Sequence, residues 1–306
     1  METAEQLKKK IASAEDLRDL VRTMKLLAVT NIRRFQEAVE ALADYYHSIE
    51  MGLQIALRRE ATSGAIDLSR WQELDQSRGD LGLVVLGTDQ GLCGRYNEVV
   101  VDYSREVIEQ EFGGERPRRI LCVGLRPALQ LEQLWHAVEV TFPVPGFPTG
   151  VTRVVQEIVF QIEKWQSLDN ITRVVVIHNE LVRGVYYQPG MYKLLPLDKE
   201  WFSRYANEPW PNPRVIPTFT MDPAPLLASL VRQYLFFSVY RSQVEALASE
   251  NAARFLSMQT AEKNIEDRLE ELHMTANQQR QNSITEELLD IVAGYEALGG
   301  SKMATV

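Results

Sequence analysis

From Glu250 to Leu298 the chain reads ENAARFLSMQTAEKNIEDRLEELHMTANQQRQNSITEELLDIVAGYEAL. This stretch contains no proline, and its only glycine, Gly294, lies near its end. These features predict a single helix, which extends back to Ala228 and at about 1.5 Å per residue would reach roughly 100 Å. Such a helix is too long to be buried inside one domain, so we expect it to pair with another helix.

Apolar and small side chains follow this helix at alternating steps of three and four residues. The series is Leu230, Tyr234, Phe237, Val244, Leu247, Ala252, Phe255, Met258, Ala261, Ile265, Leu269, Leu272 and Ala276. An average spacing of about 3.5 over many turns is the signature of a coiled coil. Alanines bury little area, so we expect a weaker pairing per turn than in a leucine zipper.

The N-terminal stretch has the same character, because Ala4 to Ala61 contains no proline and one glycine, Gly52. Its series is Ile11, Ala14, Leu17, Val21, Met24, Ala28, Asn31, Phe35, Ala38, Leu42, Tyr45, Ile49, Leu53 and Ala56. The two helices lie at opposite ends of the chain, so a pairing within one molecule is antiparallel and requires an intervening segment that reverses the chain.

The middle of the chain has a different pattern, in which short apolar runs alternate with amphipathic stretches. The runs LGLVVLG (81–87), RRILCVG (118–124), VEVTFPV (138–144) and TRVVVIHNEL (172–181) are typical of buried strands, and 96–112, 125–134 and 151–166 of helices. This alternation predicts a parallel open sheet covered on both faces. VYYQPGMYKLLPL (185–197) indicates strand pieces at an edge, because its prolines block ladder hydrogen bonds.

We therefore expect an α/β fold in which a Rossmann-like open-sheet domain is inserted between two long helices. The expected divisions are an N-terminal coiled-coil helix at 1–60, the α/β domain at 79–220, a C-terminal coiled-coil helix at 222–298 and a tail at 299–306. Asp222 and Pro223 fit the start of the last helix, with Asp as the cap and Pro at the first position.

The composition of the chain excludes several classes of function. The chain has 306 residues, a net charge of −9 and 45% hydrophobic residues. The negative charge argues against nucleic-acid binding. No apolar run is long enough to span a bilayer, so we expect no direct insertion into lipid, and the N-terminus lacks the apolar core of a signal peptide. Cys93 and Cys122 lie in apolar surroundings without a second cysteine nearby, which indicates reduced, buried thiols.

One loop resembles a phosphate cradle. It is GTDQGLCG (87–94), with Asp89, Gly91, Cys93 and Gly94. It lacks the Lys-Ser/Thr pair of a P-loop, and its glycine spacing does not match the dinucleotide fingerprint. A tight turn with Asp89 as a cap is the favoured interpretation.

The titratable side chains form no catalytic constellation. The four histidines, His47, His136, His178 and His273, are scattered. His178, at the end of an expected strand, is the best catalytic candidate, although an ordinary strand-end residue is the favoured interpretation. We expect no catalytic residue, no cofactor and no metal.

A polar cluster lies late in the C-terminal helix, where an apolar seam would be expected. It comprises Asn277, Arg280, Gln281, Asn282, Thr285 and Glu287. Two interpretations remain open: a solvated helix face, and a surface that makes and breaks polar contacts with a surrounding partner.

Three motifs, in order, resemble the gamma subunit of F-type ATP synthases, the central rotor shaft. They are IASAEDLRDLVRTMKLLAVTNIRRFQ (11–36), GTDQGLCGRYN (87–97), and 250–294 with Arg280-Gln281, Ile284-Thr285, Glu287-Leu288 and Ile291 in the family's pattern. The resemblance covers essentially the whole chain.

This resemblance implies a non-catalytic subunit whose coiled coil turns inside a hexamer of alpha and beta catalytic subunits. It also implies binding of an epsilon-type subunit and the membrane c-ring. Residues at the family's contact positions with the catalytic head are Met24, Arg254, Gln281, Thr285 and Glu287. The implied location is peripheral, on the cytoplasmic face of a bacterial membrane or the stromal or matrix side in an organelle.

Some residues depart from the family's pattern. Asp19 stands at a usually basic position, and Gln90 where arginine is usual. The family is commonly basic, whereas this chain has a pI of about 5.2. An alternative is therefore the gamma-like subunit of a sodium-type alternative ATPase. A free coiled-coil adaptor and a Rossmann-like enzyme with a site at Gly87 to Gly94 are further alternatives.

Overall fold

The computed structural model describes residues 4–63, 79–197, 201, 205, 210 and 217–299. The chain forms two compact units, which are described separately below. The first consists of residues 1–27 and 257–306, and the second of residues 28–256. These units divide both long helices, so the domain limits drawn from the sequence stay a prediction. Of the expected tail, 300–306 lies outside the described residues.

The long helices are α1 (Ala4–Ala41), α2 (Ala43–Ser63) and α8 (Pro223–Gly299), which has 77 residues. At the start of α8 the Asp222 carboxylate accepts a hydrogen bond from Ala224 N at 3.4 Å. Pro223 occupies the first helical position, where no amide hydrogen is needed. The start signal in the sequence therefore acts as expected.

The N-terminal stretch is two helices rather than the single one we expected. The backbone N–H of Leu42 donates to the carbonyl of Val39 at 3.1 Å, which closes a tight turn between the two helices. The N–H of Tyr46 donates to the carbonyl of Leu42 at 2.9 Å. Neither glycine nor proline marks this break, so the sequence gives no sign of it.

The expected seams are largely confirmed. All thirteen residues of the C-terminal series are buried or half-buried. In the N-terminal series, the predicted burial is wrong for Leu17 and Tyr45, which are 49% and 47% exposed. Their inward neighbours are Arg18 and Tyr46, and the Tyr46 ring stacks on Phe237 of α8 with a centroid distance of 4.2 Å.

The pairing is antiparallel in the second unit. Asn31 Nδ2 donates to Asn251 Oδ1 at 3.3 Å, and Tyr45 Oη donates to Gln233. The contact made by the later residue of the N-terminal helices therefore falls on the earlier residue of α8. A Cβ at Gly52 would lie 2.9 Å from Leu230, so this glycine allows α2 to approach α8 closely.

The inserted domain is built on one five-stranded sheet. Its strands are β1 (Asp80–Leu86), β2 (Arg119–Val123), β3 (Val138–Phe142), β4 (Ile171–Arg183) and β5 (Tyr186–Leu195). The spatial order is β3-β2-β1-β4-β5. The first four are parallel, with Val84 opposite Leu121 and Val176, whereas β5 pairs antiparallel with β4 at the edge.

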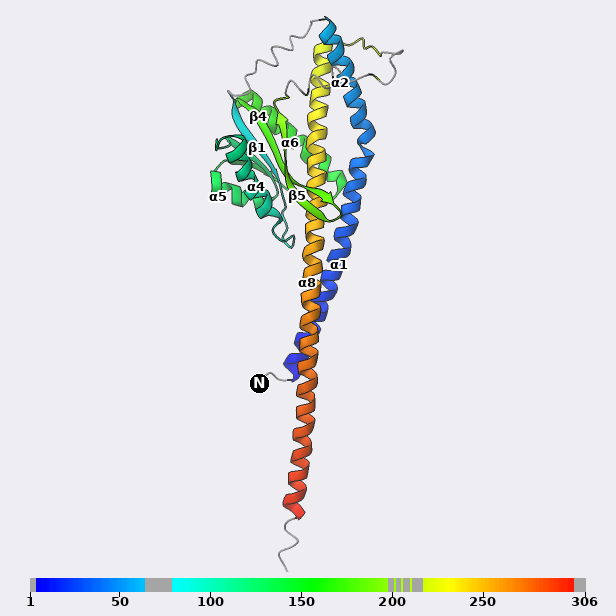
Figure 1. Ribbon diagram of the computed structural model, residues 1–306, viewed down its shortest axis with the longest axis vertical. Helices are drawn as coiled ribbons and strands as arrows, with labels where there is room; N and C mark the ends of the chain where they lie inside the picture. The colour runs from blue at the N-terminus through cyan, green and yellow to red at the C-terminus, as the bar shows by residue number, and fades with distance from the viewer. Residues whose placement is uncertain are drawn as a thin grey trace, which may run out of the picture. The chain divides into compact units, whose positions relative to one another are not determined.

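Helices cover both faces of the sheet, as Figure 1 shows. On one face, α4 (Tyr96–Glu111) and α5 (Leu125–Trp135) pack on Leu83, Val85 and Cys122. On the other, α6 (Pro148–Leu168) packs with residues of α2 and α8 on Val84 and Leu121. The alternation along each strand thus gives the domain two cores that share one sheet.

Two details of the sheet differ from expectation. The stretch 185–197 contains one continuous antiparallel strand, β5, instead of strand pieces, and Pro189 is accommodated at this edge opposite Asn179. His178 lies in the middle of β4 rather than at a strand end, because β4 continues to Arg183.

Candidate functional site

The loop after β1 is held by its own side chains. Asn97 Oδ1 accepts from Thr88 N at 3.0 Å, and Asn97 Nδ2 donates to Thr88 Oγ1 at 2.8 Å. The Asp89 carboxylate accepts from Leu125 N at 2.9 Å and Val144 N at 2.8 Å. Asp89 therefore connects the loops that follow β1, β2 and β3, which is a structural role.

Glycine is required at one point beside this loop. Gly124 has a φ of 103°, and a Cβ there would lie 2.7 Å from Thr88 N. Gly94 also has a positive φ, of 59°, whereas a Cβ at Gly91 would meet only the end of the Arg126 side chain. Gly94 of the predicted loop thus serves backbone geometry, and Gly124 beside it also allows a close approach of the backbone.

The crevice where an open α/β sheet usually binds a ligand is filled by α8. The strand order reverses between β1 and β4, and ligands of such folds bind outside the strand ends at this point. Here Tyr96 Oη donates to Ala246 O at 2.7 Å, and Ser249 Oγ donates to Asn179 O at 2.6 Å. Asn179 Nδ2 in turn donates to Tyr96 O at 3.1 Å. This packing leaves the loop without the open crevice that a Rossmann-like enzyme needs.

Cys93 lies at the same contact between the α/β domain and α8. It is 2% exposed and packs with Tyr96 and Ala253. Burial raises the pKa of its thiol, and burial also raises the pKa of Cys122 to about 12. Both cysteines are free thiols. They are therefore poor nucleophiles and poor metal ligands as they stand.

Arg254 lies on α8 one turn after Glu250, and its side chain is largely buried. Its side chain is 13% exposed and donates to Glu250 Oε1 at 2.6 Å. Burial raises the pKa of Glu250, although the Arg254 guanidinium acts in the opposite direction. Arg254 directly follows Ala253, which packs against Cys93, so the structure brings Arg254 near the Cys93 loop.

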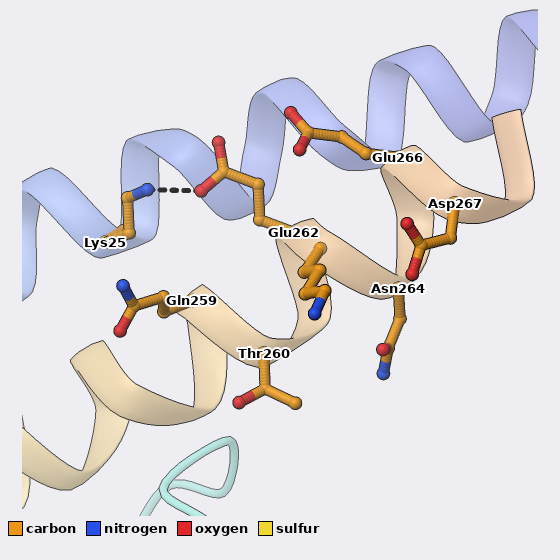
Figure 2. Close-up of a pocket in the computed structure, with 8 residues that line it drawn as sticks. Lys25, Gln259, Thr260, Glu262, Asn264, Glu266 and Asp267 are labelled. Atoms are coloured by element: carbon orange, nitrogen blue, oxygen red, sulfur yellow. Dashed lines mark hydrogen bonds and ion pairs between the residues drawn. The ribbon is translucent and has the colours of Figure 1, made fainter. Parts of the chain in front are cut away.

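In the first unit, α1 and α8 are joined by an ionic cluster, defined here as Arg22, Lys25, Glu262 and Glu266. Arg22 donates to Glu262 and Glu266, each at 2.7 Å, and Lys25 also donates to Glu262. Figure 2 shows Lys25 on one helix reaching Glu262 on the other, beside a shallow polar pocket between Gln259 and Asp267. Met24, predicted to contact the catalytic head, is half-buried next to this cluster.

The late part of α8, also in the first unit, is exposed. Gln281, Thr285 and Glu287 all lie in the continuous exposed run from Arg280 to Tyr295. Thr285 Oγ1 donates only to the Gln281 carbonyl, at 2.9 Å, in its own helix. Large apolar side chains share this segment: Ile284, Leu288, Leu289, Ile291, Val292 and Tyr295, which are 50–79% exposed.

This apolar set was already visible in the sequence as a signal for a contact surface. Exposed apolar patches of this kind mark surfaces that are covered by a partner. Ile284 lies within the polar cluster and Leu288, Leu289 and Ile291 lie just after it, and these exposed apolar side chains are the stronger indication of a partner. They also disfavour the interpretation of this segment as a merely solvated helix face.

Taken together, these features define a class: a protein of long paired helices with an inserted α/β domain whose ligand crevice is closed by its own chain. The sequence profile of the family described as ATP synthase matches residues 3–298. The chain belongs to the ATP synthase gamma-chain family.

Curated relatives support this over nearly the full length. The ATP synthase gamma chain of Glaesserella parasuis is 30% identical over 311 aligned residues, covering 97% of this chain and 100% of the relative. That of a Synechococcus species is 28% identical, covering 96% and 98%.

Solved structures share the fold. A chain of the Euglena gracilis mitochondrial ATP synthase, described with OSCP, F1 and c-ring, superposes with a TM-score of 0.62 at 17% identity, covering 99% of this chain and 97% of that one. A chain from the central stalk and c-ring structure of the Tetrahymena thermophila enzyme gives 0.55 at 17% identity, covering 79% and 99%. Within the described residues, no helix has the length and apolar character that a bilayer crossing requires.

Proposed function

We propose that this chain is the non-catalytic central stalk of an ATP synthase, which couples rotation of an ion-driven ring to ATP synthesis or hydrolysis. The observation that carries the proposal is the segment of α8 from Arg280 to Tyr295, where both apolar and polar side chains are exposed. In a gamma chain, such a segment fits the cavity of a surrounding alpha and beta hexamer.

The proposed contacts differ in how accessible they are. Gln281, Thr285 and Glu287 are exposed and can exchange partners during rotation. Exposed polar pairs are worth about 0–1 kcal/mol each, which suits contacts that must be repeatedly broken. The side chain of Arg254 is only 13% exposed and one of its nitrogens is bound to Glu250, so we assign it a lesser part in direct contact.

The remaining partners follow from the same proposal. The relatives' solved assemblies are described with a c-ring, which supports attachment of this chain to the ring and, beside it, to an epsilon-type subunit. Attachment to the ring makes the chain a peripheral membrane protein, on the cytoplasmic face of a bacterial membrane or the corresponding side in an organelle.

The sodium-type alternative is favoured by one observation, the net charge of −9 in a commonly basic family. Co-purification separates the possibilities. A tagged chain expressed in its native cell should bring down alpha and beta catalytic subunits in constant ratio. The ion-binding residues of the ring subunit recovered with them would then identify the coupling ion. Recovery of the tagged chain alone would refute the stalk proposal and favour the free adaptor.

A point variant tests the contact surface directly. Gln281→Glu places a charge on the exposed segment, and we expect it to lower coupled ATP turnover of the assembled complex without changing the melting temperature of the chain. Gln278→Glu, one turn earlier on the same helix and also exposed, is the matched control. A Gln281→Glu complex that assembles and couples like the wild type would contradict the assignment.

A further inference from the structure

Three metal-ligating side chains meet between β4 and α8 in the second unit. His178 and Glu180 lie two residues apart on β4, so they project from the same face of the strand. Glu245 comes from α8. One ligand atom from each of the three lies within 4.8 Å of the other two.

Burial and hydrogen bonding fix this group. His178 is 4% exposed, whereas both glutamates are half-buried. His178 Nε2 lies 3.2 Å from Glu245 Oε2. The second ring nitrogen, Nδ1, has no hydrogen-bond partner among the described residues. Nε2 is the nitrogen that faces Glu245, so it is the one available to an ion held by the carboxylates.

We propose that His178, Glu180 and Glu245 form a binding site for a divalent transition-metal ion of the zinc class. Imidazole and carboxylate are suitable ligands for zinc, at about 2.0–2.2 Å from the ion. Ligand atoms around such an ion lie roughly 3–3.5 Å apart, which His178 Nε2 and Glu245 Oε2 already satisfy. The ligand atom of Glu180 lies within 4.8 Å of the other two, and three protein ligands leave a fourth position for water.

Neighbouring polar groups modulate the site. Arg241 Nε donates to Glu245 Oε1 at 2.8 Å, and Gln188 Nε2 donates to Glu180 Oε1 at 3.1 Å. Each of these groups holds one carboxylate oxygen, so they orient the ligands from outside. The Arg241 cation also repels a metal ion and limits the affinity. A bound ion would link β4 directly to α8 through coordination bonds.

The test is a zinc titration of the purified full-length chain after treatment with a chelator, with a chromogenic zinc indicator as competitor. We expect saturable binding of a single ion per chain. His178→Gln should weaken the binding by at least about tenfold, since it removes the only nitrogen ligand. Cobalt(II) in place of zinc should give a visible absorption band that is absent in the variant.

The matched control is His136→Gln. His136 is an exposed histidine whose Nδ1 lies 3.8 Å from Glu132, and this histidine–carboxylate pair has no third ligand within the part of the chain that the structure describes. This variant should bind zinc like the wild type. Absence of saturable binding, or equal affinity in the His178→Gln and His136→Gln variants, would overturn the proposal.

Two further variants guard against misfolding. Glu180→Gln alters a half-buried ligand and should weaken zinc binding even if His178→Gln fails to fold. Arg241→Gln removes the repelling charge and should strengthen binding. A Glu180→Gln variant that folds and binds zinc with unchanged affinity would also refute the three-ligand site.

Discussion

Arg254 and Glu250 lie one helical turn apart on α8, with side chains only 13% and 8% exposed. Arg254→Ala leaves the carboxyl buried without its cation, and breaking a buried pair in this way costs about 3 kcal/mol or more. Burial already raises the pKa of Glu250, and loss of the cation raises it further. The carboxyl then binds a proton more readily, so the loss of stability should be smaller near pH ~5 than near pH ~8.

Denaturant unfolding at both pH values measures this effect. Arg232→Ala on the same helix is the control, because Arg232 is 64% exposed and pairs with Glu163 at 2.7 Å. Arg232→Ala should lower the free energy of unfolding by about 0–1 kcal/mol at either pH. Equal losses for the two variants would show that the Arg254 pair is not buried in solution.

The thiols of Cys93 and Cys122 are expected to be inert in the folded chain. They are 2% and 0% exposed, and burial raises the pKa of both. An aromatic disulfide reagent should therefore label neither until the chain is unfolded, when both should react. We also expect no thiol switch. A change in ATPase coupling on thiol reduction that disappears when both cysteines are replaced by serine would contradict this expectation.

At the scale of elements, Glu262 is the centre of the ionic cluster between α1 and α8. Hydrogen bonds from Lys25 and then Arg22 lower its pKa below the ordinary 4.5. A carboxyl whose pKa is lowered by folding stabilises the folded state at a pH above its pKa in the unfolded chain. This stabilisation is lost as the pH falls through its pKa in the folded chain. The helix pair of the first unit should therefore weaken in acid.

Glu262→Gln should lower the thermal midpoint of the helical circular dichroism signal at neutral pH and flatten its fall below pH ~4.5. Glu271→Gln is the control, since Glu271 pairs with Arg268 on the same helix and is 60% exposed. The same pH slope in the wild type and the Glu262 variant would refute the role of the cluster.

Local pattern was enough to predict the type of nearly every described element. Apolar runs such as LGLVVLG gave the strands, and the absence of proline gave α8, because both depend on neighbours in sequence. The antiparallel direction of β5, the break at Leu42 and the pairing of Glu262 with Lys25 depend on contacts with distant residues. Likewise, His178 and Glu245 meet only once α8 packs on β4, so their spacing in sequence carries no signal.

The contacts of the candidate residues with the catalytic head stay a prediction, and the predicted side chains differ in exposure. Gln281, Thr285 and Glu287 were identified by resemblance, and their exposure agrees with a contact role. Arg254 was assigned to the same surface, but whether a side chain on a helix pairs inwardly depends on the partner helix and the domain packed on it. Charge and spacing alone therefore could not separate Arg254 from Gln281.

At the scale of the whole molecule, the segment of α8 beyond Gln279 contributes surface for partners and little to the stability of the chain. All residues from Arg280 to Tyr295 are exposed. A variant that ends at Gln279 should keep the melting temperature of the full chain almost unchanged, because burial of apolar area is the main source of stability and this segment buries little. The assembled complex should nevertheless lose ATP-driven ion pumping.

Differential scanning calorimetry and ion-pumping assays on the assembled complex check the two parts of this prediction. The outcome opposed to it is a shortened chain that pumps ions with full efficiency, or one whose melting temperature falls sharply.

The closed crevice between β1, β4 and α8 has a mechanical consequence. Ser249 Oγ of α8 donates to Asn179 O of β4 at 2.6 Å, and Tyr96 Oη of α4 donates to Ala246 O of α8 at 2.7 Å. Turning the α/β domain about the axis of α8 would stretch these buried hydrogen bonds, and leaving their polar groups unpaired costs about 1–3 kcal/mol each. We therefore expect torque applied to the domain to be passed on to the helix.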